Sequence, residues 1–244
     1  MNQQVETQHR LLASAVHNNA AWCDAVCTAH GKPGEFSQHI WLQKHGSPRF
    51  YPDAATLTKE GRHRQEEHIA ELARQRPGGL AVKDSYRSLD LGKLGFKMLF
   101  DADWIGMAPR PASNKLTPAW QQAECEDDLY RWELAWSDSD RITETGRVFP
   151  DTLLSAPEIC FLLATEDGTL VGGGILNHAA GAVGISNVFS RGMPVQAVWE
   201  GLIATAAARF PGLPLVGYES GEDLPAALSA GFDVIGQLRV WLRS

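Results

Sequence analysis

Apolar residues recur at helical spacing near the start of this 244-residue chain. Their period is close to 3.6 residues, which predicts a helix over residues 5–30. A second helix is predicted over residues 62–76, and Pro77–Gly78–Gly79 ends it. The segment between the two helices alternates in short apolar runs, so we expect short extended pieces around a turn there.

Three further elements complete the first part of the chain. The sequence LAVKDSY, residues 80–86, is typical of a strand, and FKMLFDADWIGM, residues 96–107, predicts another. A short helix that begins at Ser88 is expected between them. The next stretch, APRPASNKLTP, holds three prolines and few apolar groups. It predicts a linker over residues 108–118.

The second part begins with a helical, acidic pattern over residues 120–136. Residues 158–189 then predict three strands, since Asp167–Gly168 and Ala180–Gly181 are typical hairpin turns. A helix over 195–210, a strand over 213–220, a helix over 222–231 and a last strand over 234–243 follow. Runs of strands with helices around them indicate an α+β fold.

Two stretches of the chain repeat one order of elements. Each runs from a helix through a Pro-Gly stop, a strand, a short helix and a Gly-Phe pair to a strand with a tryptophan. Gly95 and Gly231 are 136 positions apart, and Trp104 and Trp241 are 137 apart. Glycine suits a left-handed helix C-cap and the phenylalanine would anchor the next strand. We interpret the repeat as two copies of one unit.

Charge is divided unevenly between the two parts. Residues 1–110 carry a net charge of +2 and residues 111–244 a net charge of −9. The acidic second part argues against nucleic acid as a partner and is compatible with an amine substrate. No apolar run is long enough for a membrane span, and the N-terminal MNQQVETQHRLL lacks a signal-peptide core. We therefore expect a cytoplasmic protein without a membrane partner.

The four cysteines do not predict a disulfide framework in a chain of this length. Cys23 and Cys27 share one face of the first predicted helix. A metal site would need two further ligands at a recognised spacing, and the sequence offers none. Buried structural thiols are the simpler interpretation, and no metal site is predicted.

The second part resembles the GCN5-related N-acetyltransferase (GNAT) family. GTLVGGGILNHAAGAVGISNVFS is similar to the central hairpins of that family, RGMPVQA falls at its R-G-x-G-x-G turn, and AALSAGF falls at its L-Y-E-x-x-G-F segment. The resemblance implies a mixed, mostly antiparallel sheet flanked by helices, with acetyl-CoA as co-substrate. With the internal repeat, it implies two tandem units: a shortened GNAT-like unit over 1–107 and an acyl-CoA-binding domain over 119–244.

The resemblance also implies a place for the cofactor. Two parallel strands would splay apart and leave backbone groups free for an acyl-pantetheine arm, while a helix N-terminus would face the pyrophosphate. The residues implied are Asn187, Val188, Phe189, Ser190, Arg191, Gly192, Gln196 and Ala197. Arg191 would add a positive charge, with a plain surface residue as the alternative.

Two features depart from the family pattern. Pro194 and Gln196 stand where the family turn has glycines, and Pro194 removes an amide donor. Ala227 stands where many members have a tyrosine acid, and the repeat has Leu91 there. Tyr218 could replace that acid, while Glu219 or Ser220 could bind or deprotonate the amine.

Strand alternation places Tyr218 and Ser220 on one face and Glu219 on the other, so only one set is expected to face the site. Tyr218 as a packed aromatic residue and Glu219 as a surface residue remain alternatives. The repeat matches Lys83, Asp84 and Ser85 to the Tyr218 segment. Because no phosphate turn follows the first-part strand, we interpret the first part as structural or substrate-covering.

Three functional hypotheses follow. The first is an acyl-CoA-dependent N-acyltransferase, with direct attack of a small-molecule or peptide amine on the thioester. The second is a degenerate GNAT fold that binds acyl-CoA or another ligand without catalysis. The third is a scaffold for partner assembly, and a homodimer is possible in each case.

Overall fold

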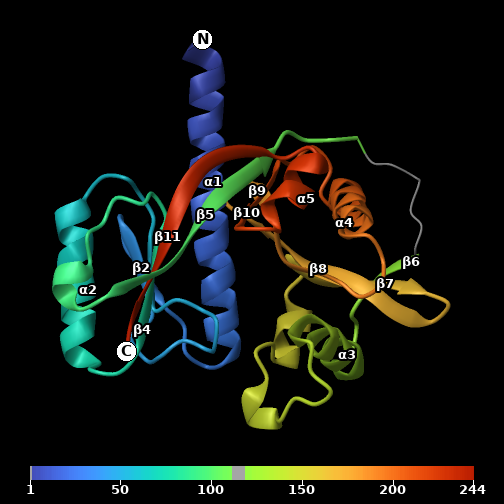
Figure 1. Cartoon of the computed structure of the whole chain (residues 1–244), viewed down its shortest axis with the longest axis horizontal. Coiled ribbons are helices and arrows are strands. Elements are labelled where there is room, and N and C mark those ends of the chain that lie inside the picture. Colours follow the sequence, from blue (N-terminus) through green and yellow to red (C-terminus); the bar gives the residue numbers. More distant parts are fainter. Residues whose placement is uncertain (1, 112–118) are drawn as a thin grey trace.

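A single mixed sheet of eleven strands forms the centre of the molecule (Figure 1). The computed structural model describes residues 2–111 and 119–244, and the strand order in this part is β1-β2-β3-β4-β11-β5-β10-β9-β8-β7-β6. All neighbouring strands are antiparallel except β3–β4 and β9–β10. The prediction of a mostly antiparallel α+β fold flanked by helices is confirmed.

The first part of the chain follows the predicted order of elements. It consists of α1 (Asn2–Ala29), β1 (Glu35–Phe36), β2 (Ile40–Leu42), β3 (Ala54–Thr56), α2 (Arg62–Gln75), β4 (Leu80–Asp84), a 3-10 turn (Gly92–Leu94) and β5 (Lys97–Met107). The predicted linker begins directly after β5. Its residues 112–118 lie outside the described residues, so the division into two domains stays a prediction.

The second part contains one strand that the sequence pattern missed. Its elements are β6 (Ala119–Gln122), α3 (Glu126–Ser137), 3-10 turns at Glu144–Gly146 and Asp151–Ser155, β7 (Ile159–Glu166), β8 (Thr169–Ala179), β9 (Ala182–Ser190), α4 (Val195–Arg209), β10 (Leu215–Glu219), α5 (Leu224–Ser229) and β11 (Asp233–Arg243).

The single helix predicted over residues 120–136 is therefore wrong in its first residues. Residues 119–122 pair with β7 as the last strand of the sheet. The helix begins only at Glu126, where three successive acidic side chains lie in the first turn and favour a helix N-terminus. In β6, the Trp120 ring fills the space that Gly201 of α4 leaves open, so packing across the sheet determines the strand.

The two predicted hairpin turns are confirmed. Asp167–Gly168 joins β7 to β8, and Ala180–Gly181 joins β8 to β9. All four residues have positive φ, as type I′ hairpin turns require.

Both Gly-Phe pairs of the repeat form the same helix end. Gly95 and Gly231 have φ of 82° and 103°. The amide of each following phenylalanine donates to a carbonyl five residues back, on Leu91 and on Ala227. Phe96 and Phe232 are buried. The repeated sequence therefore ends two short helices in Schellman-type turns and starts β5 and β11 from the core.

Strands β5 and β11 join the two parts of the chain. β11 lies between β4 and β5, and β5 lies between β11 and β10, so the last strands of the two repeats are interleaved (Figure 1). The pair runs antiparallel over nearly the full length of both strands. Arg239 and Asp101 face each other in this register and form two hydrogen bonds of 2.6 and 2.8 Å.

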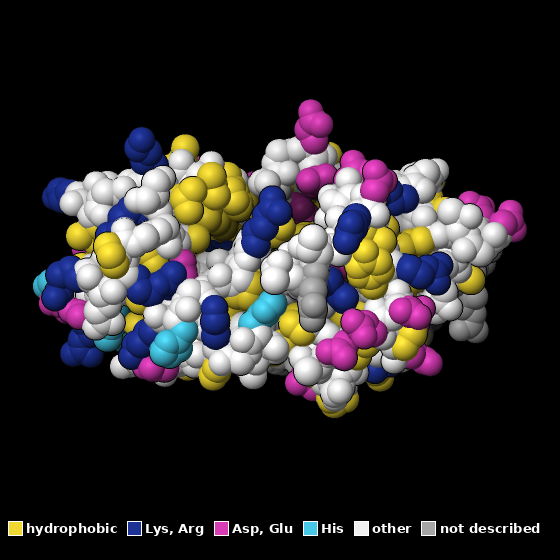
Figure 2. All heavy atoms as spheres, turned by 90° about the horizontal axis from the view of Figure 1, so that it is seen from below, with side chains coloured by type: hydrophobic (Ala, Val, Ile, Leu, Met, Phe, Trp, Pro, Cys, Tyr) yellow, Lys and Arg dark blue, Asp and Glu magenta, His cyan; other side chains and the backbone are white. Residues whose placement is uncertain are grey.

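Helices cover both faces of the sheet. Trp104 of β5 packs in a cluster with residues of α1, whereas the next residue, Ile105, packs in a cluster with α4 and α5. α3 packs its Trp132 against Phe161 in the cluster that also contains Trp22 of α1. On the face in Figure 2, acidic side chains gather at the end built by the second part, in agreement with the charge division. No helix in the described ranges is long and apolar enough to cross a membrane.

A buried pair of amides fixes α1 against the sheet. Asn18 Nδ2 donates to the carbonyls of Asn177, Ala179 and Ala182, at 3.0–3.1 Å. Asn177 Nδ2 donates to Asn18 Oδ1 at 2.9 Å. A side chain at Gly184 would have no room, because its Cβ would lie 2.1 Å from Asn18 Oδ1 and 2.4 Å from Asn177 Oδ1.

We predict that Gly184→Ala destabilises the fold by about 1–3 kcal/mol, because the added methyl must displace this buried amide pair. Gly78→Ala is the matched control, since its Cβ would meet nothing within 4 Å. Urea unfolding of both variants measures the difference. Equal midpoints for the two variants would show that the amide pair adapts without cost.

Candidate functional site

The parallel strands β9 and β10 separate after a short ladder. Only Val183 with Leu215 and Gly184 with Val216 are paired, although β9 continues to Ser190 and β10 to Glu219. Beyond Gly184, β10 gives β9 no further partner. The predicted splay between these strands is present, and it opens an edge of β9 toward the interior.

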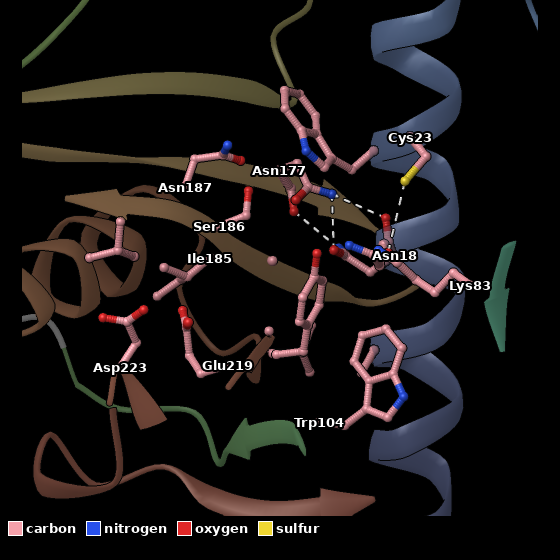
Figure 3. Close-up of a pocket in the computed structure, with 18 of the residues that line it drawn as sticks. Asn18, Cys23, Lys83, Trp104, Asn177, Ile185, Ser186, Asn187, Glu219 and Asp223 are labelled. Carbon is pink, nitrogen blue, oxygen red and sulfur yellow. Dashed lines mark hydrogen bonds between the residues drawn. The ribbon is translucent and has the colours of Figure 1, made fainter. Parts of the chain in front are cut away.

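A cavity of about 310 Å³ lies at this splay (Figure 3). Its walls come from α1, the loop before β3, β4, β5, β9, β10 and the N-terminus of α4. Phe50 and Val195 line the cavity and are exposed, so it opens to solvent. This volume is at the lower end of small-molecule sites.

The β9 wall carries a buried polar group without a partner in the described structure. Ser186 Oγ is buried and has no hydrogen-bond partner in the described structure. Asn187 has φ of 52°, and the register between β8 and β9 shifts at this point. Asn187 and Val188, two of the residues predicted to contact the cofactor, also line the cavity. A buried hydroxyl without a hydrogen-bond partner lowers the stability of the fold, and a ligand that bonds to it would remove this penalty.

The turn after β9 combines a glycine with a proline. Gly192 has φ of 102°, which favours glycine, and Ser190 Oγ donates to the Met193 carbonyl. Pro194 is the N-cap of α4 rather than a residue of its first turn. The amides of Val195 and Gln196 make no hydrogen bond with any described residue. The proline therefore removes one donor ahead of the helix and leaves the next two available.

The Arg191 side chain connects the turn to α3. Its Nε and Nη2 donate to the Ala135 carbonyl at 2.8 and 2.6 Å, and Nη1 forms an ion pair with Asp138. A cation at this place stabilises the C-terminus of α3. The guanidinium already has partners, so the positive charge expected for a phosphate is partly neutralised here.

Three other predicted cofactor residues have structural partners. The Phe189 ring packs edge-on against Trp132, at 5.3 Å between centroids. Gln196 Nε2 donates to Glu200 at 3.2 Å, along the exposed side of α4. The Ala197 amide donates to the Pro194 carbonyl at 2.9 Å.

Tyr218 and Glu219 both line the cavity, whereas Ser220 is not among its lining residues. The expectation that only one face of this strand could meet the site is therefore wrong. Strand alternation still places these two side chains on opposite faces, but β10 loses its β9 partner after Val216. The cavity extends around this open edge and reaches side chains on both faces.

Glu219 lies beside Asp223 at one end of the cavity (Figure 3). Burial raises the pKa of the Glu219 carboxyl to about 8, and the negative charge of Asp223 adds to the effect. A carboxyl with this pKa can exchange a proton near neutral pH.

Lys83 of β4 lies at the other end of the cavity with Tyr218. Its Nζ donates to Asn19 Oδ1 at 2.6 Å and lies 4.4 Å from the centre of the Tyr218 ring. That ring also packs edge-on against Trp104. Burial disfavours the lysine charge, yet interactions with Tyr218 and Cys23 outweigh it and raise the pKa of Lys83. Sequence reasoning matched Lys83 to Tyr218 through the repeat but did not place it in the site.

The equivalent gap in the first repeat is closed. β3 and β4 also pair at only two positions, but the Ser85 amide donates to Thr56 Oγ1 at 2.8 Å just beyond them. At the start of α2, Gln65 Nε2 donates to the carbonyls of His39, Thr58 and Glu60. In the first repeat, side chains of the protein therefore bond the backbone groups in the gap. The corresponding groups between β9 and β10 are left without such partners in the described structure.

Ala227 and Leu91 are both completely buried in core clusters. Neither lines the cavity, so an acid for a leaving group would have to come from another residue. In the described ranges, no group of three or more His, Cys, Asp or Glu side chains could hold a metal ion. Cys23 and Cys27 are buried free thiols.

Comparison with solved structures shows the same fold in GNAT acetyltransferases. A GCN5-related N-acetyltransferase from Kribbella flavida matches 92% of this chain over 95% of its own length, with a TM-score of 0.61 and 10% identity. A putative GNAT acetyltransferase from Novosphingobium aromaticivorans matches 91% of the chain over 96% of its own, with a TM-score of 0.54 and 15% identity.

A functionally unknown protein from Staphylococcus epidermidis matches 86% of the chain over 92% of its own, with a TM-score of 0.61 and 11% identity. No family model and no curated protein matches the sequence. The predicted GNAT fold is confirmed, and the likeness extends over both parts of the chain.

We predict that the Glu219 carboxyl titrates near pH 8 and that Asp223→Asn moves its midpoint to lower pH, because a neighbouring negative charge is removed. Carbon-13 NMR of glutamate side-chain carboxyls measures the titration, and Glu219→Gln assigns the signal. A midpoint near 4 in the unmodified protein would contradict the buried environment of this group.

Proposed function

We propose that this protein is an acyl-CoA-dependent N-acyltransferase that transfers an acetyl group to a primary amine. The observation that carries the proposal is the open edge of β9, beside a cavity that contains a carboxyl with a raised pKa. The GNAT fold supports acyl transfer at the level of the fold.

The β9 edge fits an extended thioester arm. The backbone of Ser186, Asn187 and Val188 has no β10 partner, so it could pair with an added strand-like chain. Ser186 Oγ would gain its missing partner at the same place. The amides of Val195 and Gln196, at the N-terminus of α4, would face the pyrophosphate.

Acetyl-CoA would supply the acyl group as a thioester that a neutral amine attacks directly. Transfer joins the amine nitrogen to the acyl carbon and breaks the carbon–sulfur bond. The Glu219 carboxylate accepts the proton that the amine loses, and the departing sulfur takes up a proton from Tyr218 or from solvent. A pKa near 8 places Glu219 between its carboxylate and protonated forms at the pH where amines begin to lose their protons.

The protein would contribute mainly by holding two reactants in contact. Tyr218 is kept in place by Trp104 and by Lys83 above its ring, so its hydroxyl has a defined direction. The partly apolar walls of the cavity would also limit the access of competing water. Positioning of this kind accounts for a large share of rate enhancement in two-substrate reactions.

We predict that acetyl-CoA binds to the purified chain and that Arg191→Ala weakens this binding about threefold to tenfold. Without the guanidinium, the turn at the start of α4 loses its connection to the Ala135 carbonyl and to Asp138. Isothermal titration calorimetry measures the affinity, and Arg131→Ala, on α3, is the control.

No heat at millimolar acetyl-CoA would contradict the proposed function. Binding without release of free thiol, across a panel of amines, would instead support the non-catalytic alternative. An unchanged affinity in Arg191→Ala would remove this arginine from the cofactor site.

We predict that Glu219→Gln lowers kcat by about 100-fold, a typical contribution of a general base. In the unmodified enzyme, kcat/KM should rise with pH through an apparent pKa near 8, because Glu219 must lose its proton to act. Thiol release measured from pH 6 to pH 10 gives both profiles. The variant should keep only the ionisation of the amine itself, and an identical profile would exclude Glu219 as the base.

A further inference from the structure

Lys83 is a buried cation without a negative partner in the described structure. The residue is 5% exposed, and its polar neighbours are uncharged side chains: its Nζ donates to Asn19 Oδ1, and it also interacts with Tyr218. No ion pair among the described residues includes Lys83. Burial of a charge without an opposite charge is unfavourable. The position of Lys83 at a cavity wall therefore points to a ligand whose negative charge pairs with the lysine.

The groups around Lys83 are neutral near pH 7. Burial raises the pKa of the Cys23 thiol, and it raises the pKa of the Tyr51 phenol well above its usual value. Asn19 uses Oδ1 to accept from Lys83, and its Nδ2 makes no hydrogen bond with a described residue. This end of the cavity therefore offers one positive charge and an adjacent amide donor, but no negative charge.

The opposite end of the same cavity has the reverse character. Glu219 and Asp223 lie together there, away from Lys83 and α1 (Figure 3). The splayed edge of β9, with Ser186, lies along the wall between the two ends. A molecule that fits this cavity would place an amine at Glu219 and an anionic group at Lys83.

We propose that the acceptor is a small amino acid or a similar amine, whose carboxylate is bound by Lys83 and Asn19 while its amino group faces Glu219. This inference rests on the proposed function. A carboxylate fits better than a phosphate because the site holds one cation, whereas a phosphate dianion would leave one negative charge unbalanced. The cavity of about 310 Å³ must also admit the acyl end of the donor, so the acceptor is small.

The position of Lys83 explains the role of the first repeat in this site. Lys83 lies on β4, which β11 and β5 separate from β10 in the sheet, yet its Nζ lies 4.4 Å from the centre of the Tyr218 ring. Tyr218 is in turn the neighbour of Glu219 in the chain. The first repeat would contribute the residue that selects the acceptor, and the second repeat the residues that carry out transfer.

The test compares acceptors that differ only in the carboxylate. Thiol release from acetyl-CoA is measured with the twenty amino acids, their carboxamides and their decarboxylated amines. We expect kcat/KM for at least one amino acid to exceed that of its carboxamide tenfold or more, mainly through KM. In Lys83→Met this ratio should fall to within threefold of one, and Lys83→Arg should restore part of it.

Lys93→Met is the matched control, because Lys93 is exposed and lies outside the cavity. It should keep the full ratio, and circular dichroism checks that every variant is folded. A ratio near one in the unmodified enzyme would overturn the proposal, as would a high ratio that persists in Lys83→Met.

Direct binding separates this proposal from the proposed function. Ligand-observed NMR, with CoA present, measures binding of the same amino acids and carboxamides without any need for transfer. Preferential binding of amino acids that Lys83→Met removes would support the carboxylate site even if no thiol were released. If no amino acid binds, the proposal of a carboxylate site fails. Thiol release with amines that lack a carboxylate would still support the acyltransferase function.

Discussion

The antiparallel pairing of β5 with β11 is the constraint on which the rest of the structure depends. Because each of these strands lies beside a strand of the other repeat, neither part of the chain completes its sheet alone. The same pairing sets the spacing between β4 and β10, and so brings Lys83 over the Tyr218 ring. A cavity that draws walls from both repeats follows from this interleaving. If the two repeats lay side by side without exchanging these strands, β4 would lie farther from β10, and Lys83 would not reach the gap between β9 and β10.

The fold was predictable where local sequence determines geometry. Turn pairs such as Asp167–Gly168 and the Gly-Phe helix ends specify backbone conformations within a few residues, and the structure shows them as predicted. The interleaving was not predictable, because strand exchange between repeats leaves each strand's own pattern unchanged. The strand at residues 119–122 was missed for a similar reason, since packing of Trp120 over Gly201 decides it.

The candidate site was predictable as a place but not as a set of contacts. Strand order located the splay, and Asn187, Val188, Tyr218 and Glu219 do line the cavity. The partners of Arg191 lie 53 to 56 residues away in sequence, so no local pattern could show that its guanidinium serves α3. Two similar strand gaps also differ only in whether the protein fills them. Between β3 and β4 the Thr56 hydroxyl accepts a hydrogen bond from the Ser85 amide, whereas Ser186 Oγ on β9 has no partner in the described structure.

The buried carboxyl of Glu219 in this open site lowers the stability of the folded protein as the pH rises. Its carboxyl has a pKa of about 8 in the folded chain, against about 4.3 for an unperturbed glutamate. Between these two values the folded state holds a proton that the unfolded state has lost, so stability falls as the pH rises toward 8. A purely structural residue at this position would avoid that loss. The burial that weakens the fold is the same burial that allows the carboxyl to take a proton from an amine near neutral pH, so stability and reactivity here have one physical origin.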